Sequence, residues 1–181
     1  MEKSYSDVIK FWFEEIEPIQ RWKKDPNFDA MITQKFGHVH TQASKGVLTP
    51  WRVNALGALA EIIILDQFSR NIHRDTPAAF ANDQLALRLA EDAIEQKYDQ
   101  ELEVSHRSFL YMPFMHSEEQ KIHNRAMELF VQDGLEGAYD FEKKHKVIID
   151  RFGRYPHRNE ILGRVSTPEE IEFLKQDGSS F

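Results

Sequence analysis

The sequence predicts an all-α fold of stacked antiparallel helix pairs. Apolar residues recur at helical spacing in almost every segment, prolines and glycines mark short turns between the segments, and no stretch alternates convincingly with a period of two. A chain of 181 residues normally forms one domain and buries roughly 70% of its unfolded surface. We therefore expect a single helical domain over residues 1–181, within which halves at 1–97 and 104–181 can be drawn.

The first helices are predicted by apolar spacing and by proline at helix starts. Residues 5–16 carry apolar side chains at helical spacing, which predicts an amphipathic helix. Asp25 is followed by a proline, the pattern of an N-cap and a first helical position, so a helix should run to about Ser44. Thr49, again followed by a proline, predicts the start of a strongly apolar helix that continues through Leu65.

The middle of the chain contains two helical segments and a polar stretch. Thr76, followed by a proline, predicts a helical region that runs to about Lys97. The polar residues 98–103 are the best candidate for a mid-chain linker. A short helix over residues 105–112 meets Pro113, which should end or kink it because proline lacks an amide hydrogen.

The last third of the chain is also predicted to be helical. Ser117 and Gln120 have the spacing of a capping box, which predicts a helix that runs to about Asp133. Another helix should span residues 138–152, because a glycine follows it. Thr167, followed by a proline and two glutamates, predicts the cap of the final helix.

Composition excludes several classes of function. A net charge of −7 argues against a general nucleic-acid or membrane-surface partner. The absence of cysteine removes disulfides, thiolate nucleophiles and zinc knuckles. The longest apolar stretch, residues 55–65, is too short to span a bilayer, and the N-terminus lacks the pattern of a signal peptide, so we expect a cytoplasmic protein.

Cofactor and metal motifs are missing from the sequence. It contains no glycine-rich phosphate loop and no dinucleotide-binding fingerprint, so no cofactor is expected. Glu142 and His145 form one Glu-x-x-His pair, but a di-iron bundle needs a second pair and further carboxylates. We therefore expect no metal. The adjacent aromatic residues 11–13 leave room for a homodimer interface, although such residues more often belong to the core.

One sequence motif occurs twice, 84 residues apart. Residues 64–75 and 148–159 are identical at six aligned positions, two of which are arginines and one a histidine. Cations are costly to bury unless they are paired, so the repeat marks either helix ends with internal ion pairs or a groove for an anion. The cations that would converge in such a groove are Arg70, Arg74, Arg154, His157 and Arg158.

A second candidate site surrounds Ser117. His116 and Glu118 flank this serine next to the proline of the preceding helix, and together they have the residue types needed for general acid–base catalysis. The structural alternative is that Ser117 caps the next helix, Glu118 interacts with the helix dipole and His116 is only a hydrogen-bonded neighbour.

Three motifs together resemble one family. The segments LDQFSRN with HRDTPAAFANDQLAL, FLYMPFMHSE, and IIDRFGRYPHRNEILGRVSTPEE resemble the bacterial domain-of-unknown-function family 924, over nearly the whole chain. The resemblance implies an all-helical fold similar to tetratricopeptide-repeat proteins, in a family without an established activity. The positions that match the motifs are Asp66, Gln67, Arg70, Asn71, Arg74, Arg107, Tyr111, His116, Ser117, Glu118, Arg151, Arg154, His157, Arg158, Asn159 and Arg164.

Two functions from different classes follow as expectations. The first is a binding scaffold whose groove takes a peptide or another anionic ligand, and the second is an enzyme that acts on a small anionic substrate. Candidate acid–base residues are His157, His116 and Glu118. Candidate ligand-binding residues are Asp66, Gln67, Arg70, Asn71, Arg74, Arg107, Arg154 and Arg158. An enclosed pocket with a histidine hydrogen-bonded to a carboxylate would favour the enzyme.

Overall fold

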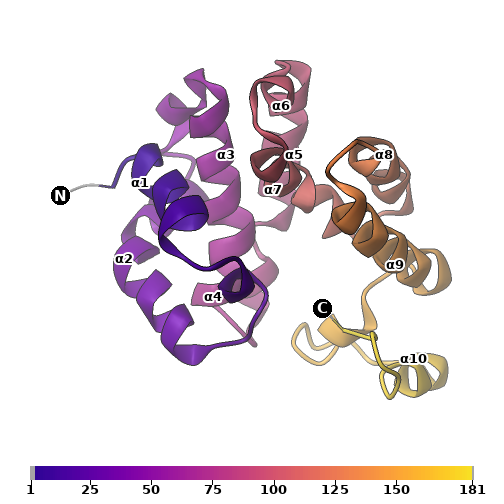
Figure 1. The fold of residues 1–181 in the computed structure, drawn as a ribbon. Helices are drawn as coiled ribbons and strands as arrows, with labels where there is room; N and C mark the ends of the chain where they lie inside the picture. Colours follow the sequence, from indigo (N-terminus) through magenta and orange to yellow (C-terminus); the bar gives the residue numbers. More distant parts are fainter. Residues whose placement is uncertain (1–2, 181) are drawn as a thin grey trace.

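A computed structural model describes residues 3–180, and in this range it contains helices and turns but no strand. The α-helices are α1 (Tyr5–Lys10), α2 (Pro26–Ser44), α3 (Ala55–Ile63), α4 (Ser69–Ile72), α5 (Asp83–Glu95), α6 (Tyr98–Glu101), α7 (Val104–Met115), α8 (Gln120–Phe130), α9 (Glu136–Phe152) and α10 (Pro168–Phe173) (Figure 1). The prediction of an all-α fold is therefore confirmed.

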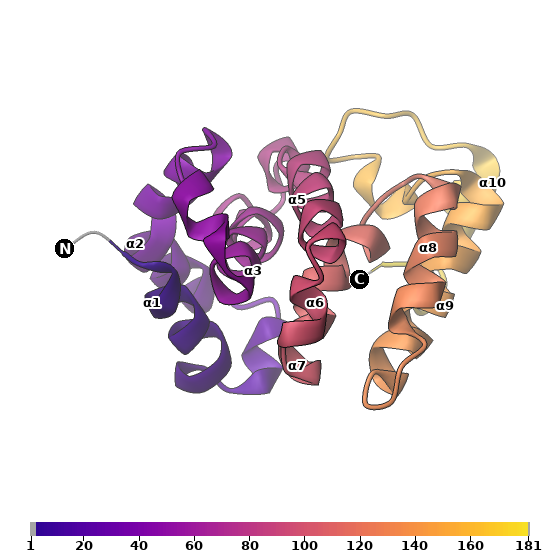
Figure 2. The same cartoon turned by 90° about the horizontal axis from the view of Figure 1, so that it is seen from above.

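The helices follow one another across the molecule in chain order. The N-terminal helices α1–α4 lie at one end, α5–α7 in the middle, and α8–α10 at the other end, and a second view shows the same order (Figures 1 and 2). Neighbours in this order pack together: α1 and α5 on α3, α2 on α4, α7 on α5 and α8, and α8 on α9. None of the helices in residues 3–180 has the length and apolarity needed to cross a membrane.

Several predicted helix ends are confirmed by their hydrogen bonds. The side chain of Asp25 accepts the amide hydrogens of Asn27 and Phe28 at the start of α2. Thr167 forms a capping box at the start of α10. Gly153 ends α9 with φ = 66°, in the left-handed region that costs glycine little.

Two predicted helix starts are wrong. Residues 49–53 form a 3₁₀ turn, and α3 starts later because Asn54, not Thr49, accepts the amide hydrogen of Gly57. Ser117 forms no capping box with Gln120. Its hydroxyl accepts the amide hydrogen of Glu119 instead, because α8 begins three residues after it.

The middle of the chain is also more helical than the sequence suggested. The predicted linker contains the helical turn α6, whose Asp99 is buried and accepts a hydrogen bond of 2.8 Å from the hydroxyl of Tyr111. Pro113 does not end α7, which continues to Met115. Pro113 has no amide hydrogen to donate to the carbonyl oxygen of Phe109, but the helix continues for two residues beyond it.

Most of the core lies in one cluster that extends from Val8 to Leu135 and is rich in aromatic residues. Phe11 and Trp12 are buried there, and both pack against the ring of Phe68. A second, smaller cluster contains Ile148, Ile149 and Tyr155. The C-terminal segment therefore has little apolar core of its own.

One glycine is required by close packing of the backbone. Gly57, in the first turn of α3, lies so close to the preceding 3₁₀ turn that a Cβ atom would clash with the carbonyl oxygen of Trp51. By contrast, Gly137 in α9 has nothing within 4 Å of the place where its Cβ would lie.

Candidate active site

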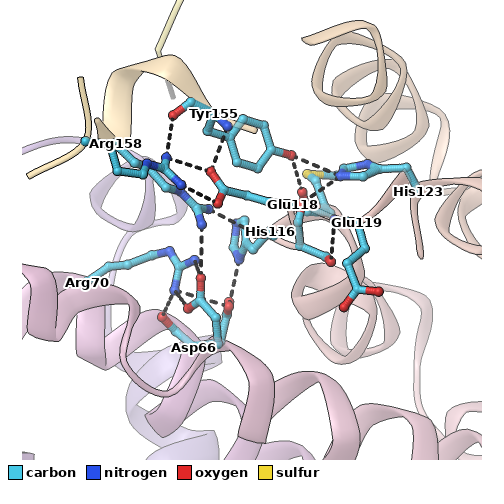
Figure 3. Close-up of polar contacts among 12 residues, drawn as sticks. Asp66, Arg70, His116, Glu118, Glu119, His123, Tyr155 and Arg158 are labelled. Atoms are coloured by element: carbon cyan, nitrogen blue, oxygen red, sulfur yellow. Dashed lines mark hydrogen bonds and ion pairs between the residues drawn. The ribbon is translucent and has the colours of Figure 1, made fainter. Parts of the chain in front are cut away.

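A cleft of about 310 Å³ lies where α5, the end of α7 and the segment after α9 meet. Its polar lining includes Asp83, His116, Glu118 and Arg158, and its apolar lining includes Phe80, Leu87, Pro113 and Leu162. The side chains of Asp66, Arg70, His116, Glu118 and Arg158 gather here from separate elements, whereas that of Glu119 points away from them (Figure 3). A volume of this size is at the lower end of the range typical of small-molecule sites.

The floor of the polar cluster comes from a π-helical turn. Residues 64–68 form this turn between α3 and α4, and it carries Asp66, which is 1% exposed. π-helical turns are rare and often occur at functional sites. The carboxylate of Asp66 accepts a hydrogen bond of 2.5 Å from the amide of Gln67 and lies 3.3 Å from Nη1 of Arg70, one turn later.

Asp66 also holds the imidazole of His116. Oδ1 of Asp66 lies 2.7 Å from Nδ1 of His116, although 50 positions separate the two residues. Burial opposes ionisation of Asp66, but His116 and Arg70 lower its pKa well below the usual range. The carboxylate can only accept a hydrogen bond, so Nδ1 of His116 carries a proton.

The protonation of His116 leaves a base at the cleft. Burial and the charge of Arg70 lower the pKa of His116, and Asp66 only partly offsets them. The imidazole is therefore neutral near pH 7, with its proton on Nδ1 and a lone pair on Nε2. Among residues 3–180, Nε2 makes no hydrogen bond, and His116 lines the cleft.

A shared carboxylate joins two arginines beside His116. Asp83, in the first turn of α5, accepts hydrogen bonds of 2.9 and 3.1 Å from Arg70 and a longer one of 3.3 Å from Nη1 of Arg158. The shorter, paired contacts hold Asp83 to Arg70. Arg158 therefore has the weaker hold on this carboxylate.

Arg158 is almost completely buried but not fully hydrogen-bonded. It is 6% exposed, and its guanidinium lies 4.5 Å from the ring centre of Phe80 and 4.6 Å from that of Tyr155. Nη2 donates a hydrogen bond of 3.0 Å to the carbonyl oxygen of His116, whereas Nε has no hydrogen-bond partner in the described part of the chain. Arg158 is the cationic residue of the cleft lining, and its Nε atom is buried.

Glu118 fixes the segment that carries Arg158. Its carboxylate accepts the backbone amide hydrogen of Tyr155 at 2.7 Å and two hydrogen bonds of 2.7 and 2.9 Å from Arg164. Burial opposes ionisation of Glu118, but these bonds lower its pKa below the usual value. Glu118 is therefore ionised and holds the cleft wall in place by these hydrogen bonds. Its environment does not favour a role as a proton donor.

The other expected ligand-binding residues lie away from the cleft. Arg74 and Asn71 both donate to Asp29 on α2. Arg154 donates to both carboxylate oxygens of Glu170. The expected convergence of all five repeat cations is therefore wrong, because carboxylates from distant elements engage Arg74 and Arg154.

Arg107 and His157 also have separate surroundings. Arg107 donates to the carbonyl oxygens of Asp99 and Leu102 and to the side chain of Gln132. Burial, together with the charge of Arg158, lowers the pKa of His157 to about 4. His157 does not line the cleft.

Sequence reasoning missed Asp83 and Phe80. Phe80 lies between the repeat and α5, and Asp83 is the first residue of α5, where an aspartate has an ordinary structural explanation. No local pattern marks Asp83 as the partner of Arg158, which is 75 positions away. The described residues contain no group of three or more acidic or histidine side chains arranged to hold a metal ion.

Comparison with known proteins gives a family and a fold. A family model described as a bacterial protein of unknown function, DUF924, matches residues 8–178. The fold is similar to the solved structure of a protein of unknown function from Agrobacterium tumefaciens, with a TM-score of 0.88 and 35% identity, covering 94% of this chain and 96% of that chain. No curated protein matches the chain.

Proposed function

We propose that this chain, which belongs to the DUF924 family of bacterial proteins of unknown function, is an enzyme that transfers a proton to or from a small molecule in the cleft. The observation that carries the proposal is the 2.7 Å hydrogen bond between buried Asp66 and Nδ1 of His116, which leaves Nε2 as a base at the cleft. A carboxylate that orients a histidine in this way is a recurring device of acid–base catalysis.

The proposed substrate carries one anionic group. Arg158 lines the cleft, and its hydrogen bond to Asp83 is long enough to give way to a better acceptor. The carboxylates of Asp83 and Glu118 lie close by and are paired with Arg70 and Arg164, and Arg70 also pairs with Asp66. A second negative charge on the substrate would find no free cation and would meet these carboxylates.

The apolar lining suits the rest of such a molecule. Phe80, Leu87, Pro113 and Leu162 offer nonpolar contacts around the polar group. This combination of an apolar cleft with a few convergent polar groups is typical of sites for small molecules.

We favour this function over a scaffold that binds an extended peptide. A peptide groove would need arginines distributed along an open surface, but Arg74 and Arg154 are held by Asp29 and Glu170. The remaining cation at the cleft, Arg158, is nearly buried. An anionic peptide tail is therefore the weaker candidate ligand.

The experiment is a turnover screen with matched variants. Purified protein would be incubated in D₂O with a panel of small monocarboxylic acids, and products or deuterium incorporated into the substrate would be detected by mass spectrometry. His116→Asn keeps an amide donor toward Asp66 but removes Nε2, so we expect turnover to fall by about 10²–10⁴-fold. His38→Asn changes an exposed histidine and serves as the control.

The two halves of the proposal have separate readouts. Arg158→Lys keeps the charge and loses the planar fork, so we expect weaker substrate binding with a smaller change in kcat. Turnover by His116→Asn at the wild-type rate would contradict the catalytic assignment. Equal binding by Arg158→Lys and the wild type would contradict the assignment of the anion site.

A further inference from the structure

Three consecutive backbone carbonyls around His116 are each held by a different side chain. The hydroxyl of Tyr155 donates to the oxygen of Met115 at 2.6 Å, Arg158 donates to the oxygen of His116 at 3.0 Å, and Nε2 of His123 donates to the oxygen of Ser117 at 2.8 Å. The carbonyls at the end of a helix lack partners within the helix and need others. Here the partners come from α8 and from the segment after α9 (Figure 3).

The donor role of His123 follows from its surroundings. A carbonyl oxygen can only accept, so Nε2 of His123 must carry a proton. Nδ1 lies 2.7 Å from Oε1 of Glu142, and both side chains are 0% exposed. A proton lies between these two atoms whether the pair is written as imidazolium and carboxylate or as imidazole and carboxylic acid. Glu142 on α9 thus fixes the ring orientation of His123 and keeps a proton on its Nε2.

We propose that Tyr155 and the buried His123–Glu142 pair are positioning residues for His116. By holding the carbonyls on either side of it, they fix the peptide from which the imidazole reaches Asp66. Their relevance to catalysis rests on the proposed function, whereas their effect on the imidazole can be measured without any substrate.

The arrangement does more than end a helix. A helix end needs any donor for its carbonyls, and water serves at most exposed ends. At this site the donors are buried or nearly buried, and one of them requires a second buried side chain to hold its proton. Oε2 of Glu142 and Nε of Arg158 have no hydrogen-bond partner among the described residues. Moving the peptide that carries His116 would leave further buried polar groups without partners, which is costly, so the arrangement resists that movement.

The test compares two buried tyrosines. Tyr155→Phe removes the bond to the Met115 carbonyl, and Tyr111→Phe removes a buried hydrogen bond of 2.8 Å to Asp99, away from His116. The pKa and tautomer of His116 would be followed by NMR of the labelled imidazole, in the full chain without ligand.

We expect Tyr155→Phe to raise the pKa of His116 toward the ordinary value of about 6.5, because a loosened ring meets more water. The population of the tautomer with its proton on Nδ1 should fall at the same time. Tyr111→Phe should lower stability and leave the titration of His116 unchanged.

A second pair of variants tests the buried acid. Glu142→Gln can donate to Nδ1 of a neutral His123 and so preserves the proton on Nε2, whereas Glu142→Ala leaves that ring without its partner. We expect the His116 titration to be retained in Glu142→Gln and shifted in Glu142→Ala.

The proposal is overturned if the pKa and tautomer of His116 in both Tyr155→Phe and Glu142→Ala match those of the wild type. It is also overturned if Tyr111→Phe shifts His116 as much as Tyr155→Phe does. A failed turnover screen would instead count against the proposed function alone, because the NMR readout needs no substrate.

Discussion

Acid should destabilise this protein steeply between pH 6.5 and pH 4, because it buries neutral histidines. Burial lowers the pKa of His40 to about 4, that of His145 to about 3 and that of His157 to about 4. In the unfolded chain each has a pKa of about 6.5. Below that pH the unfolded state binds more protons than the folded state, so stability is complete above pH 6.5 and is lost as the pH falls.

The size of the effect follows from these pKa differences. Each proton that is taken up on unfolding changes the free energy of unfolding by about 1.4 kcal/mol per pH unit. Between pH 7 and pH 5, each of the three histidines should cost about 2 kcal/mol, and the three together on the order of 5 kcal/mol. A domain of this kind is stable by only about 5–15 kcal/mol, so the loss is large.

Urea denaturation at pH 7 and pH 5 measures this loss. His40→Gln keeps a donor toward the hydroxyl of Ser69, which lies 2.8 Å from Nε2 of His40, and removes one titrating group. We expect the difference between the two pH values to shrink by about 2 kcal/mol in this variant. His38→Gln changes an exposed histidine and should leave the difference intact. Equal stability of the wild type at pH 7 and pH 5 would refute the reasoning.

Three further predictions concern packing, pairing and catalysis. Gly57→Ala forces a methyl group into the backbone of the preceding turn and should destabilise the fold by at least 2 kcal/mol in urea denaturation, on the order of other overpacking changes. Gly137→Ala, which meets open space, should be neutral or slightly stabilising, and a comparable loss there would contradict the packing argument. Arg158→Ala should lower the melting temperature clearly more than Lys175→Ala, because Arg158 is 6% exposed and Lys175 is an exposed lysine. Equal melting temperatures of the two variants would contradict this prediction. Once a substrate is known, kcat/KM should fall with acid at a midpoint below about 6.5, because the pKa of His116 is lowered and only its neutral form is a base; a midpoint above that value would contradict the assignment.

Local signals in the sequence were enough for most of the fold. Asp25 and Thr167 cap helices as predicted, because an N-cap depends on residues within one turn of it. The start of α3 was misplaced because Thr49 and Asn54 are both acceptable caps by residue type, and Asn54 is the one that accepts the amide hydrogen of Gly57. Local chemistry therefore predicted the helices and several of their starts, but not the starts of α3 and α8.

The candidate site was only half predictable for the same reason. His116 and Arg158 could be singled out by residue type and motif, but their partners lie far away in the chain. Asp66 is 50 positions from His116, and Asp83 is 75 positions from Arg158. Neither pairing has a local signature, so a cation that joins the cleft could not be distinguished from one, such as Arg74, that is neutralised elsewhere.

The hydrogen bonds that Glu118 accepts from Tyr155 and Arg164 have a consequence for the order in which the site is completed. During synthesis, Asp66 and His116 leave the ribosome well before Tyr155 and Arg164, the two residues that Glu118 holds. Asp66 and His116 are thus present in a nascent chain that still lacks Tyr155, which we propose to hold the peptide of His116, and one wall of the cleft. Under the proposed function, the site is complete only after the chain has been made past Arg164.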